Sequence, residues 1–337
     1  MSFDVRNWED VAPDFSSTLI VGNGASISVN ECFRYDQLLG AARAEGLIQP
    51  QYDQIFSYFG TEDFEQILRM LWHAFHINQA LGITESKTND AYSSIRAALI
   101  AVVRRHHVVY DDAFEYLDPI WQFMKRFRTV LSLNYDLLIY WAILRGNQQL
   151  GGRWFKDGFV QDAQFDDNWK QYRKPLGTSA VTMVFYPHGN LALATHFDGV
   201  EVKLSAPSTY LGDLRDYILE QWHAASVTPL FVSEGTSQQK LAAILRSRYL
   251  RTVYREVLAD LGSDVAIFGW GIGEHDTHIL SQIGSTVKRA AVSIYRGARP
   301  AHEIETECAS KAALLHKHGV GDIRFFWADS SGCWTTA

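Results

Sequence analysis

The sequence predicts an α/β protein with a doubly wound, mostly parallel sheet and a helical insertion. Short apolar runs of the kind that form buried parallel strands alternate along the chain with segments whose apolar residues recur about every 3.6 positions. A second observation is a helical stretch of roughly 65 residues between the first two strands, which is too long for a simple crossover. We expect one domain over residues 1–337, with the insertion at 60–127.

Apolar runs bounded by glycine, proline or polar residues predict the strands. They lie at residues 18–21, 128–133, 181–186, 191–195, 200–204, 227–232, 264–268, 291–295 and 323–327. The runs at 191–195 and 200–204 are expected to form a hairpin, because Asp198 and Gly199 between them favour a tight turn.

A helical period of the apolar residues predicts the helices. They cover residues 30–47, 61–81, 91–107, 112–127, 137–144, 210–225, 238–245, 249–261, 277–288 and 301–318. Ser237 and Asp276 are expected to cap the helices that follow them. Residues 1–16 have the composition of a polar lead-in, and residues 146–180 that of loops.

Composition narrows the classes of protein. The net charge of −7 and the absence of a Lys/Arg-rich block argue against direct nucleic-acid binding. No run of 18 apolar residues is present and the first residues are acidic and polar, so we expect neither a membrane span nor a signal peptide, and a cytoplasmic location. Cys32, Cys308 and Cys333 lie far apart without a C-x-x-C pair, which suggests neither disulfides nor a cysteine zinc site.

The stretch from Ser17 to Val29 joins the first strand directly to a glycine loop. Gly22 and Gly24 allow close backbone approach, and Ser26 can cap a following helix. A strand, a glycine loop and a helix start together aim backbone N–H groups at one point, which suits a phosphate. We therefore interpret residues 22–26 as a cradle for a nucleotide diphosphate; the alternative is a tight turn without a ligand.

Two common nucleotide motifs are missing from this loop. Ile27 stands where the dinucleotide fingerprint G-x-G-x-x-G has its third glycine, which makes a hydride-transferring dehydrogenase less favoured. The P-loop pattern G-x-x-x-x-G-K-[ST] is absent as well.

Distinctive polar or glycine-rich sequences leave four of the predicted strands. They are G-N-G-A-S at 22–26, S-L-N-Y-D at 132–136, P-H-G at 187–189 and G-W-G at 269–271, with Asp276 beyond the last. Because the carboxyl ends of parallel strands share one edge of a sheet, these exits are expected to face a common ligand crevice. We expect this site to lie between that edge and residues 60–127.

In this combination the chain resembles the sirtuin superfamily, and more closely the bacterial sirtuin-like proteins of anti-phage defence and their relatives. Those proteins have a G-x-G-x-S phosphate loop, a [ST]-x-N-x-D element, a His-Gly pair and a late glycine-rich strand exit, in this chain order. The matching residues are Gly22, Gly24, Ser26, Ser132, Asn134, Asp136, His188, Gly189, Gly269 and Gly271.

The resemblance implies that the protein binds NAD and breaks its nicotinamide–ribose bond. Asn134 would orient a water or a ribose hydroxyl, His188 would act as general base, and Asp136 would organise the nicotinamide end. The expected contacts to NAD are Gly22, Asn23, Gly24, Ala25, Ser26, Arg34, Gly269, Trp270, Gly271, Asp276 and Tyr295.

The proposed site residues also have structural interpretations. Asn134 or Asp136 can cap the following helix, and Asp276 can do the same for its own helix. His188 can be a turn histidine that is bonded to the backbone. These alternatives stay open at the level of the sequence.

Metal binding is not expected. His73 and His76 lie three residues apart on a predicted helix, and His275 and His278 flank Asp276. Neither group has a third ligand at an obvious spacing, so the sequence predicts no metal site.

The chain departs from the sirtuin pattern in several places. Protein deacylases of that superfamily carry a zinc module of two C-x-x-C pairs, which is absent here, and Leu133 stands where their motif has glutamine. Arg34 is one residue out of register with their Phe-Arg pair, and Tyr295 can equally be a solvated strand end. The first two departures argue against peptide deacylation and leave water as the simplest acceptor.

The sequence therefore favours hydrolysis of NAD to nicotinamide and ADP-ribose, with a role in anti-phage defence by analogy. One alternative is a module that senses NAD or ADP-ribose without turnover and signals through the insertion. Another is transfer of ADP-ribose to protein. The insertion is also a candidate surface for an activator protein or for a second copy of the chain.

Overall fold

The computed structural model describes residues 3–34, 38–196, 198–207, 209–224, 227–232 and 236–336. The last residue of the helix expected at 210–225 lies outside them. No helix in these ranges is both long enough and apolar enough to cross a bilayer.

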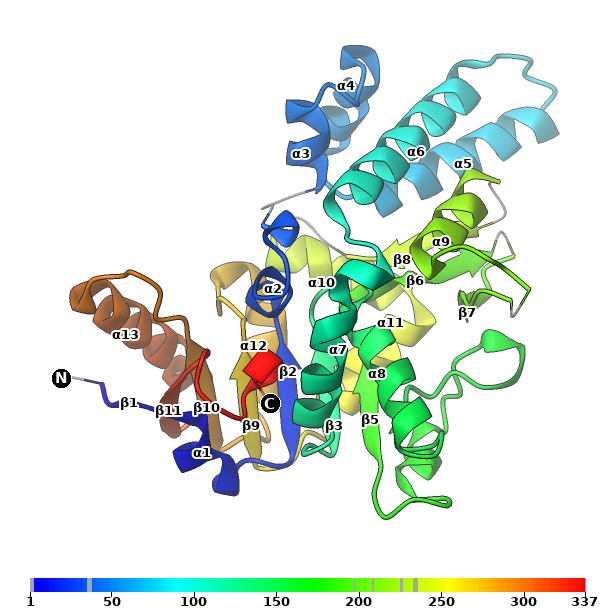
Figure 1. Ribbon diagram of the computed structural model, residues 1–337. Coiled ribbons are helices and arrows are strands. Elements are labelled where there is room, and N and C mark those ends of the chain that lie inside the picture. The colour runs from blue at the N-terminus through cyan, green and yellow to red at the C-terminus, as the bar shows by residue number, and fades with distance from the viewer. Residues whose placement is uncertain are drawn as a thin grey trace.

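A parallel sheet of eight strands forms the centre of the molecule (Figure 1). Four of its inner strands are buried throughout, and every strand pair in it is parallel. In spatial order they are β1 (Val5–Arg6), β11 (Asp322–Trp327), β10 (Arg289–Ile294), β9 (Asp264–Phe268), β2 (Thr18–Val21), β3 (Thr129–Ser132), β5 (Thr182–Phe185) and β4 (Phe155–Lys156). This sheet, with helices packed around it, confirms the predicted α/β class.

The strand order reverses direction beside β2. From β2 the chain moves outward through β3 to β5, and it later returns to place β9 on the opposite side of β2. A right-handed crossover rule then puts the connecting helices of the two halves on opposite faces of the sheet. The carboxyl ends of β2, β3 and β9 consequently border a switch point, where open α/β sheets bind their ligands.

Helices cover both faces of this sheet (Figure 1). On one face α7 (Tyr110–Met124) packs against α8 (Leu138–Gln149). The other helices that connect the strands are α10 (Ser237–Arg246), α11 (Arg248–Thr252) with a π turn at Val253–Val257, α12 (Thr277–Ile283) and α13 (Ala301–Lys317). Where a single helix was predicted at 249–261, α11 passes directly into the π turn, which ends at Val257.

A smaller antiparallel sheet stands beside the main one. It contains β7 (Glu201–Lys203), β6 (Gly189–His196) and β8 (Val227–Phe231), with α9 (Leu214–His223) between β7 and β8. The pairing of β6 with β7 confirms the predicted hairpin. The strand expected at 227–232 exists, but it joins β6 in this second sheet, because the chain turns out of the main sheet at Gly189.

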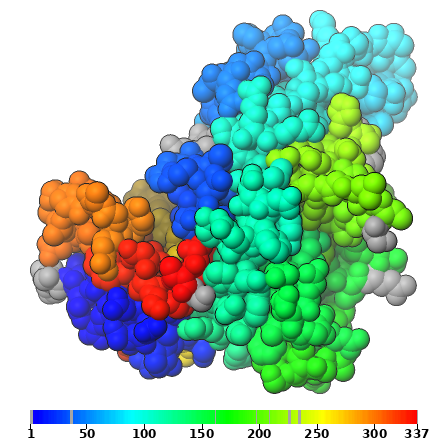
Figure 2. All heavy atoms as spheres, in the orientation of Figure 1, coloured from blue at the N-terminus to red at the C-terminus, as the bar shows by residue number. Residues whose placement is uncertain are grey.

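Four helices form a helical lobe that we define as residues 38–106. They are α3 (Leu38–Ala44), α4 (Pro50–Phe59), α5 (Phe64–Ala80) and α6 (Lys87–His106). Figure 2 shows this lobe projecting from the rest of the molecule. The helix expected at 30–47 is shorter than predicted: among the described residues, the short α2 (Asn23–Ile27) is followed by a 3-10 turn at Glu31–Phe33, and α3 begins at Leu38. Helix α7, the last helix of the expected insertion, packs on the main sheet through α8.

The first residues are more ordered than a polar lead-in. They contain β1, which extends the main sheet beside β11, and α1 (Trp8–Val11), followed by a 3-10 turn at Ala12–Asp14. Trp8 is fully buried, and its ring lies 5.3 Å from that of Phe123 and 4.8 Å from that of Phe326. The apolar Trp8 thus fastens this segment to the core.

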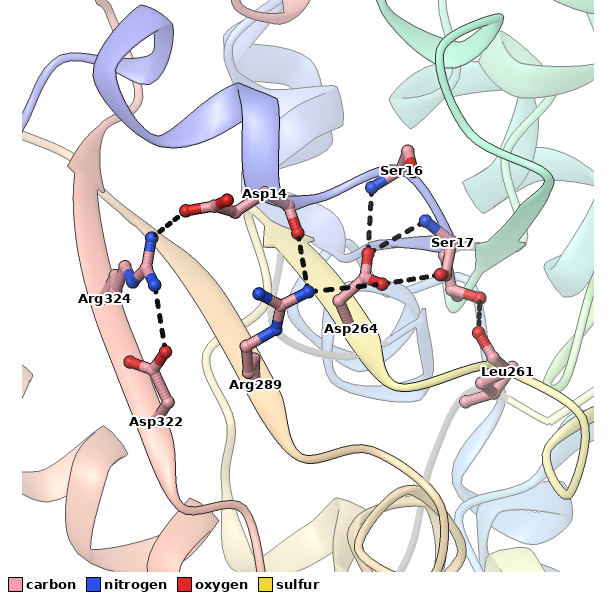
Figure 3. Close-up of polar contacts among 9 residues, drawn as sticks. Asp14, Ser16, Ser17, Leu261, Asp264, Arg289, Asp322 and Arg324 are labelled. Carbon is pink, nitrogen blue, oxygen red and sulfur yellow. Dashed lines mark hydrogen bonds and ion pairs between the residues drawn. The ribbon is translucent and has the colours of Figure 1, made fainter.

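Ionic contacts tie together the amino-terminal edge of the sheet (Figure 3). Asp264 at the start of β9 accepts hydrogen bonds from the backbone N–H groups of Ser16 and Ser17, at 2.8 and 2.9 Å. Arg324 on β11 pairs with Asp14 at 2.5 Å. This edge lies at the opposite end of the strands from the predicted ligand crevice.

Candidate functional site

A pocket of about 950 Å³ lies at the carboxyl edge of the sheet, between that edge and the helical lobe. The loops after β2, β3 and β9 form one wall, and α3, α4 and the turn after α4 form another. Its lining residues are Gly22, Asn23, Gly24, Phe33, Leu38, Arg43, Phe56, Ser57, Gly60, Thr61, Glu62, Leu133, Asn134, Tyr135, Asp136, His188, Val232, Thr236, Gln239, Lys240, Gly269, Trp270, Gly271, His275 and Asp276.

Most of the residues singled out from the sequence meet in this one pocket. All four strand exits contribute to its lining, which is what a shared carboxyl edge predicts. The predicted residues that line it are Gly22, Asn23, Gly24, Asn134, Asp136, His188, Gly269, Trp270, Gly271 and Asp276. Ala25 and Ser26 lie behind the first loop, where they are buried.

Arg34 and Tyr295 do not line the pocket as it is described. The guanidinium of Arg34 makes two hydrogen bonds to Glu31, of 2.6 and 3.1 Å, on the protein surface. Tyr295 follows β10 and is 63% exposed. The structure therefore does not bring these two expected contacts to the other candidate residues.

The glycine loop is shaped by its packing against the exit of β9. A Cβ atom added to Gly22 would lie 2.5 Å from Trp270 Cα, and one added to Gly24 would lie 2.9 Å from Gly269 Cα. Gly269 has a φ of 68°, and a Cβ there would lie 2.2 Å from the backbone nitrogen of Ala25. Glycine is required at these positions because two backbones touch.

Backbone hydrogen bonds already use part of this loop. The N–H groups of Gly22, Gly24 and Ala25 donate to carbonyl oxygens of Phe268, Gly269 and Gly22, at 2.9, 2.7 and 3.0 Å. The phosphate cradle expected from the sequence cannot be built on these three groups. Any anion contact of the loop has to use other donors.

Asn134, Ser26 and Asp136 form a buried hydrogen-bonded group. The Asn134 amide donates to the Gly22 carbonyl at 3.0 Å and to Ser26 Oγ at 2.8 Å. Ser26 Oγ in turn donates to Asp136 Oδ2 at 2.5 Å, and Asp136 Oδ1 accepts the backbone N–H of Leu138 at 2.9 Å. Asp136 therefore does contact the first turn of α8, as the capping alternative suggested, while its second oxygen holds the glycine loop.

Burial dominates the ionisation of Asp136. Desolvation raises the pKa of its carboxyl, and the hydrogen bonds from Ser26, Leu138 and Asn134 oppose that rise. Asn190 on β6 also donates to the backbone carbonyl of Asp136, at 2.5 Å. Asp136 thus lies where three loops are tied together, at the floor of the pocket.

His188 lies deeper than a turn histidine on the surface would. Its Nε2 atom is 3.0 Å from Nε2 of His278, and the ring is buried. Burial lowers the pKa of His188 to about 4. The pKa of His278 is lowered to about 3 by burial and by the positive charge that His188 carries when it is protonated. Both imidazoles are therefore neutral at pH 7.

Asp276 is held by two donors from different segments. Lys240 Nζ on α10 donates to its Oδ1 and Trp270 Nε1 to its Oδ2, both at 2.9 Å. Burial works against ionisation, but His188, Lys240 and Trp270 together lower the pKa of Asp276 to about 2. Asp276 precedes α12 as predicted, yet it makes no side-chain capping bond; its two oxygens accept from Lys240 and Trp270 instead.

His188, Asp276 and His278 each offer a possible metal-ligand atom, and these atoms lie within 4.8 Å of one another. The sequence placed His275 and His278 beside Asp276 but could not supply a third ligand; His188 comes from a distant strand exit. The two Nε2 atoms face each other directly and Lys240 brings a positive charge to Asp276. These features favour a hydrogen-bonded cluster over a cation site.

Sequence reasoning missed His278, Ser237 and Lys240 as partners of the site. His278 was considered only as a metal ligand, and Ser237 only as a cap; the cap of α10 is in fact Thr236, which forms a capping box with Gln239. The short spacing between Asp276 and His278 was the one sequence signal for these partners. The other contacts depend on packing between segments that are far apart in the sequence. The wall expected from residues 60–127 is supplied by Gly60, Thr61 and Glu62. The other described lobe residues of the pocket precede that range and were not predicted; they are Leu38, Arg43, Phe56 and Ser57.

The fold and the pocket define an α/β protein with a polar site at the switch point of a parallel sheet. The chain matches the family described as "Domain of unknown function (DUF4917)" over residues 19–334, and it therefore belongs to that family. No curated protein matches the chain.

Proposed function

We propose that this protein hydrolyses NAD to nicotinamide and ADP-ribose. The observation that carries the proposal is that Asn134 and His188 line the same pocket as the glycine exits of β2 and β9. The volume of about 950 Å³ lies at the upper end of the range of roughly 300–1,000 Å³ that small-molecule sites occupy, as a dinucleotide requires.

The reaction needs positioning and one base. Water attacks the ribose carbon that carries nicotinamide, the carbon–nitrogen bond breaks, and nicotinamide leaves as a neutral molecule that keeps the bonding electrons. The proton of the attacking water passes to His188 and then to solvent. Asn134, whose amide is fixed by Gly22 and Ser26, would orient the ribose or the water.

Charge around the pocket is compatible with this ligand. The Asp136 carboxyl lies at the floor, where it would meet the cationic nicotinamide ring of the bound dinucleotide. Lys240 on α10 and Arg43 of the lobe line the pocket, and each is paired with a carboxylate, Asp276 at 2.9 Å and Asp53 at 2.7 Å. To bind the diphosphate these two cations would share or exchange those partners, a role for which the N–H groups of Gly22, Gly24 and Ala25 are not available.

A second candidate function is a module that binds NAD or ADP-ribose without turnover. The direct contact between His188 and His278 favours it, because a base whose lone pair is engaged does not accept a proton. In this case the lobe, which forms one wall of the pocket, would report the bound nucleotide to an activator protein or to a second copy of the chain. Transfer of ADP-ribose to protein is the remaining alternative, and we place the protein in the cytoplasm.

Incubation of the purified protein with NAD tests these functions. We expect free nicotinamide and ADP-ribose in equal amounts, and at least a 100-fold loss of release, roughly the contribution of a general base, in His188→Ala. Asn134→Ala should reduce nicotinamide release by a similar factor. The exposed control variant His302→Ala should release nicotinamide as fast as the unmodified protein. Tight NAD binding without release would favour the sensor, labelled protein would favour transfer, and absence of NAD binding would exclude all three.

A further inference from the structure

The two buried histidines form a hydrogen bond whose direction can be assigned. Their Nε2 atoms are 3.0 Å apart while their ring centroids are 5.2 Å apart, so the two nitrogens point nearly at each other. Because both rings are neutral at pH 7, one nitrogen must donate a proton and the other must accept it.

The outer contacts of the pair decide which ring donates. Ser237 Oγ lies 3.0 Å from Nδ1 of His278 and donates to it, so Nδ1 is unprotonated and the neutral ring carries its proton on Nε2. His278 therefore donates from Nε2, and Nε2 of His188 accepts with its lone pair, which leaves the proton of His188 on Nδ1.

Ser237 is well placed for this role. Its Oγ accepts the backbone N–H of His278 at 2.9 Å, which leaves its own proton for His278 Nδ1. The groups that face the pair include Asp276 and Lys240, and the ring of Tyr254 lies 6.5 Å from that of His278. A single chain of donors thus runs from Ser237 through His278 to His188.

We propose that His278, held by Ser237, is an autoinhibitory side chain that occupies the Nε2 lone pair of His188 and prevents it from accepting a proton in the resting protein. Its effect on turnover rests on the proposed NAD hydrolysis, whereas the arrangement of protons does not. Release requires that the ring of His278 turns away, which breaks its hydrogen bonds to His188 and to Ser237.

Helix α10 connects this contact to the helical lobe. Ser237 and Lys240, on its first turn, hold His278 and Asp276, and Gln239 between them donates to the carbonyl of Gly60 in the lobe at 2.8 Å. Gly60 also lines the pocket. A ligand or partner that moves the lobe would pull on the same helical turn that fixes His278, so the lobe is the expected source of the releasing signal.

Nitrogen-15 spectra of the histidine side chains test the arrangement without any substrate. At pH 7 the full-length protein should show His188 with its proton on Nδ1 and His278 with its proton on Nε2, with His188→Gln and His278→Phe supplying the assignments. Ser237→Ala should change the tautomer balance of His278, while Ser281→Ala, on the exposed side of α12, should not. The same tautomer for both rings, or a charged ring, would overturn the proposal.

Nicotinamide release then tests the inhibitory role. His278→Phe keeps an aromatic ring but has no N–H, and we expect it to raise release by roughly two- to tenfold, the factor by which one hydrogen bond shifts an equilibrium. Ser237→Ala should raise release less, and His302→Phe should leave it unchanged. A fall in release in His278→Phe with unchanged NAD affinity would show that His278 assists His188, which contradicts the proposal. If no variant releases nicotinamide while the tautomers are as assigned, the proposed hydrolysis is wrong, but the hydrogen bond that occupies the lone pair of His188 is confirmed.

Discussion

The amide of Asn134 donates to the hydroxyl of Ser26 over 2.8 Å, and the same hydroxyl donates to Asp136. Two neighbouring strand exits, after β2 and after β3, are joined by this serine. It supports the pocket from behind, since Ser26 does not line it.

Ser26→Ala should lower the free energy of unfolding by about 1–3 kcal/mol, because it leaves the buried Asp136 carboxyl and the Asn134 amide each short of a partner. Urea denaturation at pH 7 measures this change. Ser28→Ala is the matched control: its hydroxyl donates only to the Ala25 carbonyl and lies at the surface, so a change within about 0.5 kcal/mol is expected. Equal effects at the two serines would contradict the supporting role of Ser26.

Alanine scanning of the glycine exits should separate packing from ligand contact. Gly22→Ala is expected to destabilise the protein by about 1–3 kcal/mol or more, because its Cβ would lie 2.5 Å from Trp270 Cα, a backbone atom. Gly271→Ala has no heavy atom within 4 Å of the new Cβ, and it should leave the melting temperature nearly unchanged while altering NAD affinity. A melting temperature for Gly22→Ala equal to that of the unmodified protein would contradict the interlocked loops.

Lys240→Met should destabilise the protein by about 3–5 kcal/mol at pH 7, since it leaves the largely buried Asp276 charged without its cation. The pKa of Asp276, which is about 2 with Lys240 present, should rise in this variant. Asp276→Asn in the same chain should recover part of the loss, and the double-mutant cycle isolates the pair. Additive losses in urea denaturation would show that the two groups are not coupled.

The buried acid Glu65 should make stability depend on pH in a recognisable direction. Burial raises its pKa to about 8 from an ordinary 4.5, against the effect of Arg69, with which it pairs. The folded protein therefore holds a proton that the unfolded chain releases above about pH 4.5, and this contribution to stability is lost as the pH rises toward 8.

Glu65→Gln resembles the protonated acid at every pH. It should remove the part of the decline between pH 4.5 and 8 that Glu65 causes, and the variant should gain stability relative to the unmodified protein as the pH rises. The exposed Glu305→Gln serves as control. An unchanged pH profile in Glu65→Gln, measured by urea denaturation at pH 5 and pH 8, would show that Glu65 ionises normally.

Much of the fold follows from local patterns, because a strand that is buried on both faces has to be apolar throughout. The segments at 18–21 and 264–268 are recognisable for this reason and coincide with β2 and β9. β1 and β4 have two residues each, which is too short to leave a pattern. The antiparallel partner of β8 depends on where the chain turns at Gly189, and no local pattern determines that turn.

The candidate site could be predicted where it depends on strand exits. Parallel strands deliver their carboxyl ends to one edge, so Asn134 and His188 reach the same pocket even though they are far apart in the sequence. Arg34 and Tyr295 could not be placed in this way, because each lies at a position set by the packing of loops. The contact of His278 with His188 was hidden for the same reason.

Because the backbones at Gly22 and Gly269 pack directly against each other, the loops after β2 and β9 form one rigid unit. Facing them, the lobe is joined to α10 by the hydrogen bond from Gln239 to the Gly60 carbonyl. A ligand larger or smaller than the present cavity must then be accommodated by movement of the lobe. Residues 38–62 would therefore set which ligand sizes bind, while the rigid loops after β2 and β9 hold the groups that carry out the chemistry.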